Sequence, residues 1–195
     1  MRSRSWLADT TVLFLAGVDK LSDAEFDAPT GLPGWTRRHL VAHVHFNALA
    51  LARLVSWAAT GTENPMYPSM ERRNAEIEEG ALLAAGELRR LVHASAEDLD
   101  AAIDALSRDS WEQEVVTAQG RTVAATEIPW MRARELAVHA VDLGAGATFA
   151  DLPDDLVTTL LTDVVTRRAA GGEGPGLAAW LTGRTAEAPA LGPWL

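Results

Sequence analysis

The 195-residue sequence contains no cysteine. This absence excludes disulfide bonds, metal sites built from thiolates and a catalytic thiol supplied by the chain itself. Any thiol chemistry carried out by this protein must therefore use a thiol from another molecule. Lysine is almost as scarce, because Lys20 is the only lysine among 17 basic residues. This arginine bias, together with abundant alanine, is typical of a GC-rich bacterial genome.

Basic residues are also too few to balance the acidic residues. The 27 acidic residues give the chain a formal net charge of −10 at pH 7. Nucleic acids and anionic membranes attract clustered positive charge, so we expect neither as a partner. No apolar run reaches 18 residues, and the N-terminal segment lacks the apolar core of a signal peptide. We therefore expect a cytoplasmic protein.

The sequence lacks an alternating β–α–β pattern and a glycine-rich phosphate loop, which excludes the common nucleotide-binding folds. Apolar residues instead recur at helical spacing between clear breakers. Thr36 and Ser69 are suitable N-caps, and Pro129 suits a first helical turn. The pattern predicts a β-hairpin within 111–123, a glycine-rich linker at 171–176, and helices at 4–19, 36–61, 69–94, 96–107, 126–143, 151–170 and 177–182.

These elements predict an all-α protein whose main part is a helical bundle. We place the bundle at residues 1–150 and a short helical C-terminal extension at residues 151–195. The tryptophans, Trp35 among them, are interpreted as packing residues rather than as a cage around a cofactor.

Glu135 and His139 are four residues apart, so a helix places both side chains on one face, one turn apart. Together with a second histidine they could hold a divalent metal such as zinc and leave one coordination position open, as catalytic zinc sites do. The helix at 36–61 offers three histidines. His43 lies on its predicted core face, while His39 and His45 are the rival ligands.

A simpler interpretation is that Glu135 and His139 form an ordinary hydrogen-bonded pair, which is common on helices. Their neighbourhood favours a site, because Arg132, Glu135, His139 and Asp142 form a polar stripe on an otherwise apolar helix. Burying unpaired charge is costly, so such a stripe either faces solvent or serves a purpose inside the bundle. We expect Asp142 to support His139 from the side away from a metal.

Three segments resemble the mycothiol-dependent maleylpyruvate isomerase family, a branch of the DinB-like helical bundles. They are PGWTRRHLVAHVHFNALALARL at 33–54, MYPSMERRNAEIEEGA at 66–81 and IPWMRARELAVHAVDLGAG at 128–146. The resemblance implies a DinB-like four-helix bundle from an actinobacterial source. It also implies that His43, Glu135 and His139 hold a divalent metal, usually zinc.

The resemblance further implies that Tyr67 and Arg73 lie beside the thiol cofactor, mycothiol, and the substrate. Full-length relatives continue into a second domain of ~80–100 residues, whereas few residues remain here after Ala150. A catalytic arginine from that region matches Arg184 alone. Arg132, Arg73 and Arg184 are the candidate cations for a dicarboxylate substrate.

The implied reaction is the cis-to-trans isomerisation of maleylpyruvate to fumarylpyruvate by reversible addition of a thiol to the double bond. One alternative keeps the metal and mycothiol but transfers the thiol to another electrophile, as an S-transferase. A second alternative is a bundle that binds a metal or ligand without turnover. In each case we expect small-molecule partners. A homodimer is the oligomeric state that we consider.

Overall fold

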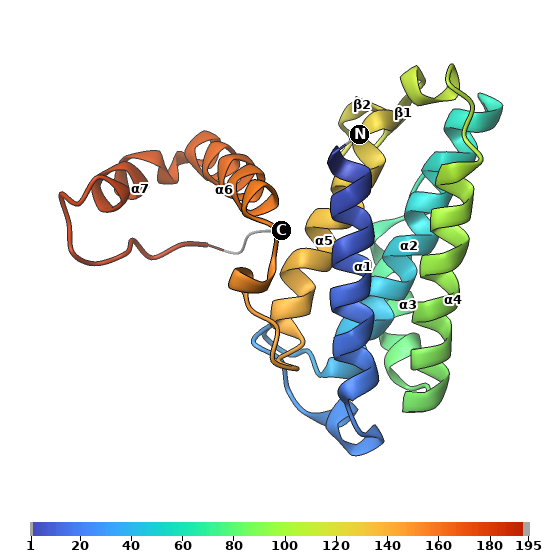
Figure 1. The fold of residues 1–195 in the computed structure, drawn as a ribbon, viewed down its shortest axis with the longest axis horizontal. Helices are drawn as coiled ribbons and strands as arrows, with labels where there is room; N and C mark the ends of the chain where they lie inside the picture. The colour runs from blue at the N-terminus through green and yellow to red at the C-terminus, as the bar shows by residue number, and fades with distance from the viewer. Residues whose placement is uncertain (1, 193–195) are drawn as a thin grey trace. The chain divides into compact units, whose positions relative to one another are not determined.

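The computed structural model describes residues 2–192. The chain divides into two compact units, Met1–Asp151 and Leu152–Leu195 (Figure 1). Each unit is described below by itself.

The first unit is a helical bundle. Its four main helices run largely alongside one another (Figure 1), and they are α1 (Arg2–Lys20), α2 (Arg37–Thr60), α4 (Ala85–Asp104) and α5 (Ile128–Asp142). A shorter helix, α3 (Met70–Ala81), packs on α2. α2 also packs against α4 and α5, while the main partner of α1 is α5. The predicted all-α four-helix bundle is confirmed.

The ends of α2 and the start of α3 follow from local chemistry. Thr36 is the N-cap of α2, and Gly61 ends the helix in the left-handed conformation that glycine adopts most easily. At the start of α3 the Ser69 hydroxyl accepts a hydrogen bond from the Arg72 backbone N–H at 3.1 Å. Both predicted N-caps are confirmed.

The predicted helices at 69–94 and 96–107 are wrong in their boundaries. The chain leaves the helical conformation after Ala81, and α4 then runs without interruption from Ala85 to Asp104. No proline or glycine marks this break at residues 82–84, so the sequence gives little local warning of it. The break lets α3 and α4 pack separately against α2.

A small hairpin and the start of α5 complete the first unit. β1 (Glu114–Val116) pairs antiparallel with β2 (Thr122–Ala124), and Val115 faces Val123 across the pair. This confirms the predicted hairpin. Pro129 lies in the first turn of α5, as expected.

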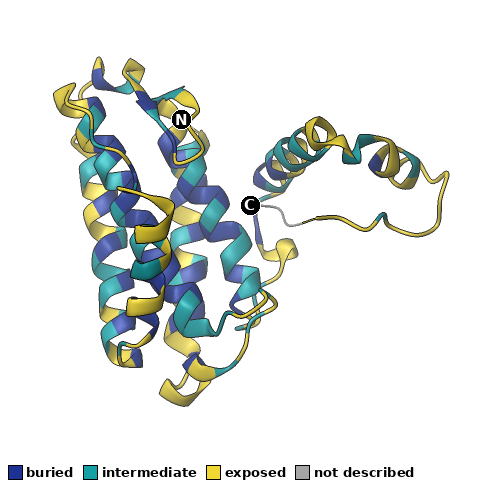
Figure 2. Cartoon of the chain, turned by 180° about the vertical axis from the view of Figure 1, so that it is seen from behind, coloured by how far each residue is buried: buried dark blue, intermediate teal, exposed yellow. Residues whose placement is uncertain are grey.

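The core lies between the main helices, with buried residues on their inward faces (Figure 2). Its largest fully buried side chains include Phe14, Leu51, Leu88 and Leu136. α2 is long and apolar enough to pass a test for membrane-spanning helices, but 67% of the tested stretch is buried inside the structure. A core helix of a soluble bundle passes the same test.

The second unit contains α6 (Asp154–Arg168), a single π-helical turn (Ala169–Glu173) and α7 (Gly174–Leu181). The predicted linker at 171–176 is wrong, because the chain keeps turning through this segment. It kinks at Gly172, where φ is +94°, a value that glycine adopts without strain, and α7 begins at Gly174. Only three leucines are buried in α6 and α7, namely Leu156, Leu160 and Leu177.

Candidate metal centre

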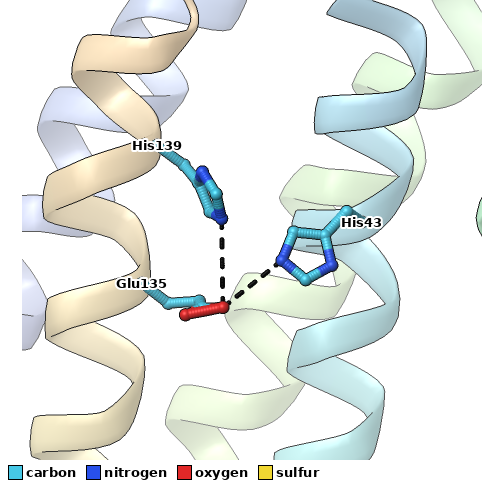
Figure 3. Close-up of side chains that lie close together, drawn as sticks. All are labelled: His43, Glu135 and His139. Carbon is cyan, nitrogen blue, oxygen red and sulfur yellow. Dashed lines mark hydrogen bonds and ion pairs between the residues drawn. The ribbon is translucent and has the colours of Figure 1, made fainter. Parts of the chain in front are cut away.

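Three side chains from two helices converge inside the bundle (Figure 3). α5 supplies Glu135 and His139 from successive turns of one face, and α2 supplies His43 from its buried side. One ligand atom of each residue lies within 4.8 Å of the other two. Among the described residues 2–192, this is the one such cluster of three or more His, Asp or Glu side chains. We call these three residues the ligand cluster.

The Glu135 carboxylate is the centre of the cluster. Its Oε1 lies 3.3 Å from His43 Nε2 and 3.9 Å from His139 Nε2. The first contact crosses from α5 to α2, whereas the second stays within α5. All three side chains are largely buried, so the contacts are shielded from water.

Burial and pairing together set the charges of the cluster. Burial alone would raise the pKa of Glu135, but the hydrogen bond from His43 and the nearby charge of His139 lower it to about 2. Burial is the main effect on His43 and lowers the pKa of its imidazole. At neutral pH the cluster therefore contains an ionised carboxylate beside a neutral His43.

His139 is oriented by a second carboxylate. Its Nδ1 lies 2.9 Å from Asp142 Oδ2, which accepts the Nδ1 proton. The opposite ring nitrogen, Nε2, then faces Glu135 Oε1 at 3.9 Å. Carboxylates commonly hold metal-binding histidines in this way.

Arg73 and Tyr67 lie beside the cluster, and their predicted place next to the thiol and the substrate stays a prediction. Arg73 Nη2 is 3.3 Å from His43 Nδ1, and the guanidinium lies 6.0 Å from the centre of the Tyr67 ring. Burial raises the pKa of Tyr67, so its hydroxyl keeps its proton at neutral pH. Arg73 thus contacts the cluster through a hydrogen bond.

Arg132 lies in the bundle interior with 1% of its surface exposed. Its Nη1 donates to the Val44 carbonyl and to Asn47 Oδ1, both at 2.8 Å. Two acceptors on α2 thus already occupy this nitrogen. Asn47 is a functional candidate that the sequence analysis missed, since an asparagine on a core-facing stripe gives no signal of its partner.

Arg184 belongs to the second unit. It is exposed and donates to the nearby Thr182 carbonyl. Its predicted catalytic role stays a prediction.

The neighbouring aromatic and histidine residues have other contacts. The Trp35 ring packs against the His43 ring with centroids 5.3 Å apart. The rival ligand His39 accepts a hydrogen bond from the Thr36 backbone N–H at 3.2 Å and so helps to cap α2. His45 is buried against Phe46. Neither rival is part of the ligand cluster.

The donor set fits a divalent metal such as zinc. Zinc–nitrogen and zinc–oxygen bonds of about 2.0–2.2 Å place neighbouring ligands of a tetrahedral ion roughly 3.3–3.5 Å apart. The 3.3 Å from His43 Nε2 to Glu135 Oε1 matches this spacing, and the 3.9 Å from His139 Nε2 to the same oxygen is longer than it. An ionised Glu135 carboxylate and a neutral His43 imidazole are also the forms in which these groups bind a metal.

Comparison with known proteins shows close relatives of this bundle. The family model of the mycothiol maleylpyruvate isomerase N-terminal domain matches residues 7–144. The crystal structure of a mycothiol-dependent maleylpyruvate isomerase is 44% identical in sequence and has a TM-score of 0.86, covering 88% of this chain and 71% of that chain. A mutant of such an isomerase, with one histidine replaced by alanine, matches with a TM-score of 0.85 and the same identity and coverage.

A more distant structure shares the fold alone. YfiT from Bacillus subtilis, a probable metal-dependent hydrolase with an unusual four-helix bundle topology, is 16% identical and has a TM-score of 0.56. The match covers 73% of this chain and 85% of YfiT. No curated protein matches the sequence.

Proposed function

Because the chain belongs to the mycothiol maleylpyruvate isomerase family, we propose that it converts maleylpyruvate to fumarylpyruvate with mycothiol as the thiol. The observation that carries this proposal is the convergence of His43, Glu135 and His139 in a chain that is 44% identical to such an isomerase over 88% of its length. The chain has no cysteine, so a thiol that adds to the double bond must come from another molecule.

The ligand cluster holds the metal in this proposal, and we propose that the metal is zinc. A bound divalent ion raises the thiolate fraction of a thiol whose ordinary pKa is about 8.5. Two histidines and one carboxylate leave a coordination position open, which suits a catalytic rather than a structural role. Asp142 keeps His139 in the tautomer whose Nε2 can bind.

Arg73 is the residue that we assign to the dicarboxylate substrate. Its guanidinium can bind a carboxylate through two parallel hydrogen bonds. His43 Nδ1 can accept from Arg73 only while His43 Nε2 carries the proton. If His43 held a metal through Nε2, its Nδ1 would carry the proton and could not accept from Arg73, which would then be available to an anion.

Tyr67 extends this substrate region. Its ring lies against the Arg73 guanidinium and its hydroxyl remains a hydrogen-bond donor. We assign Tyr67 and Arg73 to the surroundings of the thiol and the substrate. Arg184 is proposed as a second substrate arginine, supplied by the second unit.

The remaining assignments come from the sequence and are proposals in their own right. We propose that the domains lie at residues 1–150 and 151–195, and that the protein works in the cytoplasm of an actinobacterium. Its partners are then a small substrate and a low-molecular-weight thiol, without nucleic acid or a membrane, and its assembly is a homodimer.

Metal analysis tests the site first. We expect near-stoichiometric zinc in the purified wild-type protein and its loss in His43→Ala, Glu135→Gln and His139→Ala. His93→Ala is the matched control, because His93 also contacts a carboxylate, Asp19, at 2.9 Å but lies outside the cluster. Metal that persists in the three cluster variants would contradict the proposed site.

A turnover assay then tests the reaction. Wild-type protein with mycothiol should convert maleylpyruvate to fumarylpyruvate, and none of the cluster variants should do so at a comparable rate. A protein that binds zinc and mycothiol but forms only thioether products with other electrophiles would be an S-transferase. Zinc binding with neither activity would indicate a binding role.

A further inference from the structure

Two arginines join α2 to α5 at opposite ends of the ligand cluster. Arg37, at the first turn of α2, donates from Nε to the Leu143 carbonyl at 2.8 Å and from Nη2 to the Gly144 carbonyl at 3.0 Å. These carbonyls follow the last residue of α5, where no further helical N–H is available to them. Gly144 has φ +63°, and an added Cβ would lie 3.4 Å from Arg37 Nη2.

The second bridge runs in the reverse direction. Arg132 on α5 donates from Nη1 to the Val44 carbonyl and to Asn47 Oδ1 on α2, both at 2.8 Å. Each of the two helices thus supplies the arginine of one bridge, and the other helix or its C-terminal end supplies the acceptors. We call these contacts the Arg37 bridge and the Arg132 bridge.

The ligand cluster lies between the two bridges along both helices. On α2, His43 falls between Arg37 and the acceptors Val44 and Asn47. On α5, Glu135 and His139 fall between Arg132 and the carbonyl of Leu143. The α5 ligands are fixed relative to each other by one helical turn, so the distance from His43 to Glu135 depends on how α2 and α5 are held together.

The Arg132 bridge is costly for a merely structural contact. Its guanidinium is fully buried, no carboxylate is within hydrogen-bond distance among the described residues, and Nη2 has no partner there. Burying a charge without a hydrogen-bonded carboxylate is costly, so overall stability alone does not explain an arginine here. Its two hydrogen bonds do give a defined separation between the helices.

We propose that Arg37 and Arg132 are positioning residues that set the separation of α2 and α5, and with it the geometry of the metal ligands. This inference rests on the proposed metal site. In this proposal Arg132 is not the cation that binds the substrate, because its Nη1 already donates to acceptors on α2. Arg73 keeps its proposed role at the substrate.

Cobalt(II) is a suitable probe, since its visible absorption reports the geometry of its ligands. The variants are Arg37→Gln, Arg132→Met and Arg132→Lys, each loaded with Co²⁺ and compared with the wild-type protein. Arg89→Gln is the matched control: Arg89 also donates to a backbone carbonyl, that of Leu21 at 2.9 Å, but joins α4 to the segment after α1. Circular dichroism measures the helix content of every variant.

We expect Arg37→Gln and Arg132→Met to bind Co²⁺ about 10–100-fold more weakly, as for other residues that orient ligands, and to alter its absorption bands. Arg132→Lys keeps one donor to α2 and should recover part of the affinity. Arg89→Gln should lower thermal stability without changing affinity or spectrum. The Arg37→Gln variant, altered at the end of the bundle, still provides the test if Arg132→Met fails to fold.

Two results would overturn the proposal, and they differ. Folded Arg37→Gln and Arg132→Met with wild-type affinity and spectrum would remove the positioning role while leaving the metal site intact. A wild-type protein that binds no Co²⁺ would remove the metal site itself, and the positioning role with it.

Discussion

The imidazole of His139 has a carboxylate on the side that faces away from the ligand cluster. Asp142 Oδ2 is 2.9 Å from Nδ1 and is one helical turn further along α5. This contact selects the tautomer with a free Nε2 lone pair and limits rotation of the ring. Metal affinity should therefore depend on a residue that never touches the metal.

We expect Asp142→Ala to weaken zinc binding about 10–100-fold, as other losses of supporting carboxylates do. Competition with a coloured chelator measures the affinity. Asp19→Ala removes an equivalent carboxylate from His93 and should leave zinc affinity unchanged. Equal affinities for Asp142→Ala and wild type would show that His139 needs no orienting partner.

The lowered pKa of Glu135 predicts how the stability of the metal-free protein changes as the pH falls. Its pKa is lowered from 4.5 to about 2 in the folded state, so the unfolded state takes up a proton first as the pH falls. The stabilisation is complete above about pH 4.5 and disappears as the pH approaches 2, a contribution on the order of 3 kcal/mol. The lowered pKa of His43 also reduces the stability of the folded state as the pH falls, and this loss begins near the ordinary pKa of histidine.

Urea unfolding of the metal-free protein between pH 3 and 7 measures this effect. The free energy of unfolding should fall more steeply with acidification in the wild type than in Glu135→Gln, which cannot take up the proton. Parallel curves for the two proteins would mean that Glu135 is not selectively stabilised as a carboxylate. Comparing two proteins that differ at one position cancels the other acidic groups.

The sequence predicts part of the site better than the rest. Helical spacing alone brings Glu135 and His139 together, and the core-facing stripe favours His43. The contact from Arg73 to His43 and the two bridges depend on how helices pack over long sequence separations, and no local pattern encodes that. Asn47 shows this limit, because its role comes entirely from Arg132 on another helix.

At the scale of elements, the position of α3 depends on a close approach to α2. Gly80 packs so tightly that an added Cβ would lie 2.8 Å from Ala42 Cβ and 3.0 Å from Phe46 Cε2. The sequence does not predict that α3 ends at Ala81, because apolar spacing continues through the break. Packing on α2, rather than local propensity, thus determines where α3 and α4 separate.

Gly80→Ala should push α3 away from α2 and destabilise the protein by about 1–3 kcal/mol, as overpacking in a core does. For a chain of this size each kcal/mol lowers Tm by roughly 2–4 °C. Gly86→Ala is the matched control, since Gly86 lies in α4 with no heavy atom within 4 Å of the added Cβ. It should be neutral or slightly stabilising.

Gly80→Ala also tests the link between α3 and the site. Arg73 reaches His43 from α3, so a displaced α3 should raise the KM for maleylpyruvate more than it lowers zinc affinity. An unchanged Tm and KM would mean that α2 and α3 adjust to the extra methyl group without moving Arg73.

On the scale of the whole molecule, the net charge of −10 contrasts with the positive groups gathered around one site. Arg73 and Arg132 lie close to the ligand cluster, and a bound divalent ion would add to their charge. A low-dielectric interior strengthens such a field, which favours an anionic substrate inside a protein that repels anions elsewhere. The bundle itself is predictable from the sequence because breakers separate most of its helices, the break between α3 and α4 being the exception. The π-helical turn at Ala169–Glu173 is not, because its glycines permit a linker equally well.

The proposed role of Arg184 in binding the substrate is the prediction that involves the second unit. Its side chain is exposed and its described contact is local, so Arg184→Ala should leave Tm and zinc content unchanged. If Arg184 contributes a charged hydrogen bond to the substrate, its loss should lower kcat/KM for maleylpyruvate roughly 10–100-fold, the effect of losing about 1.5–3 kcal/mol. Arg108→Ala, which removes the same charge from another exposed position, should have no such effect. Equal kcat/KM values for both variants would place all the substrate arginines in the bundle and leave the second unit without a part in turnover.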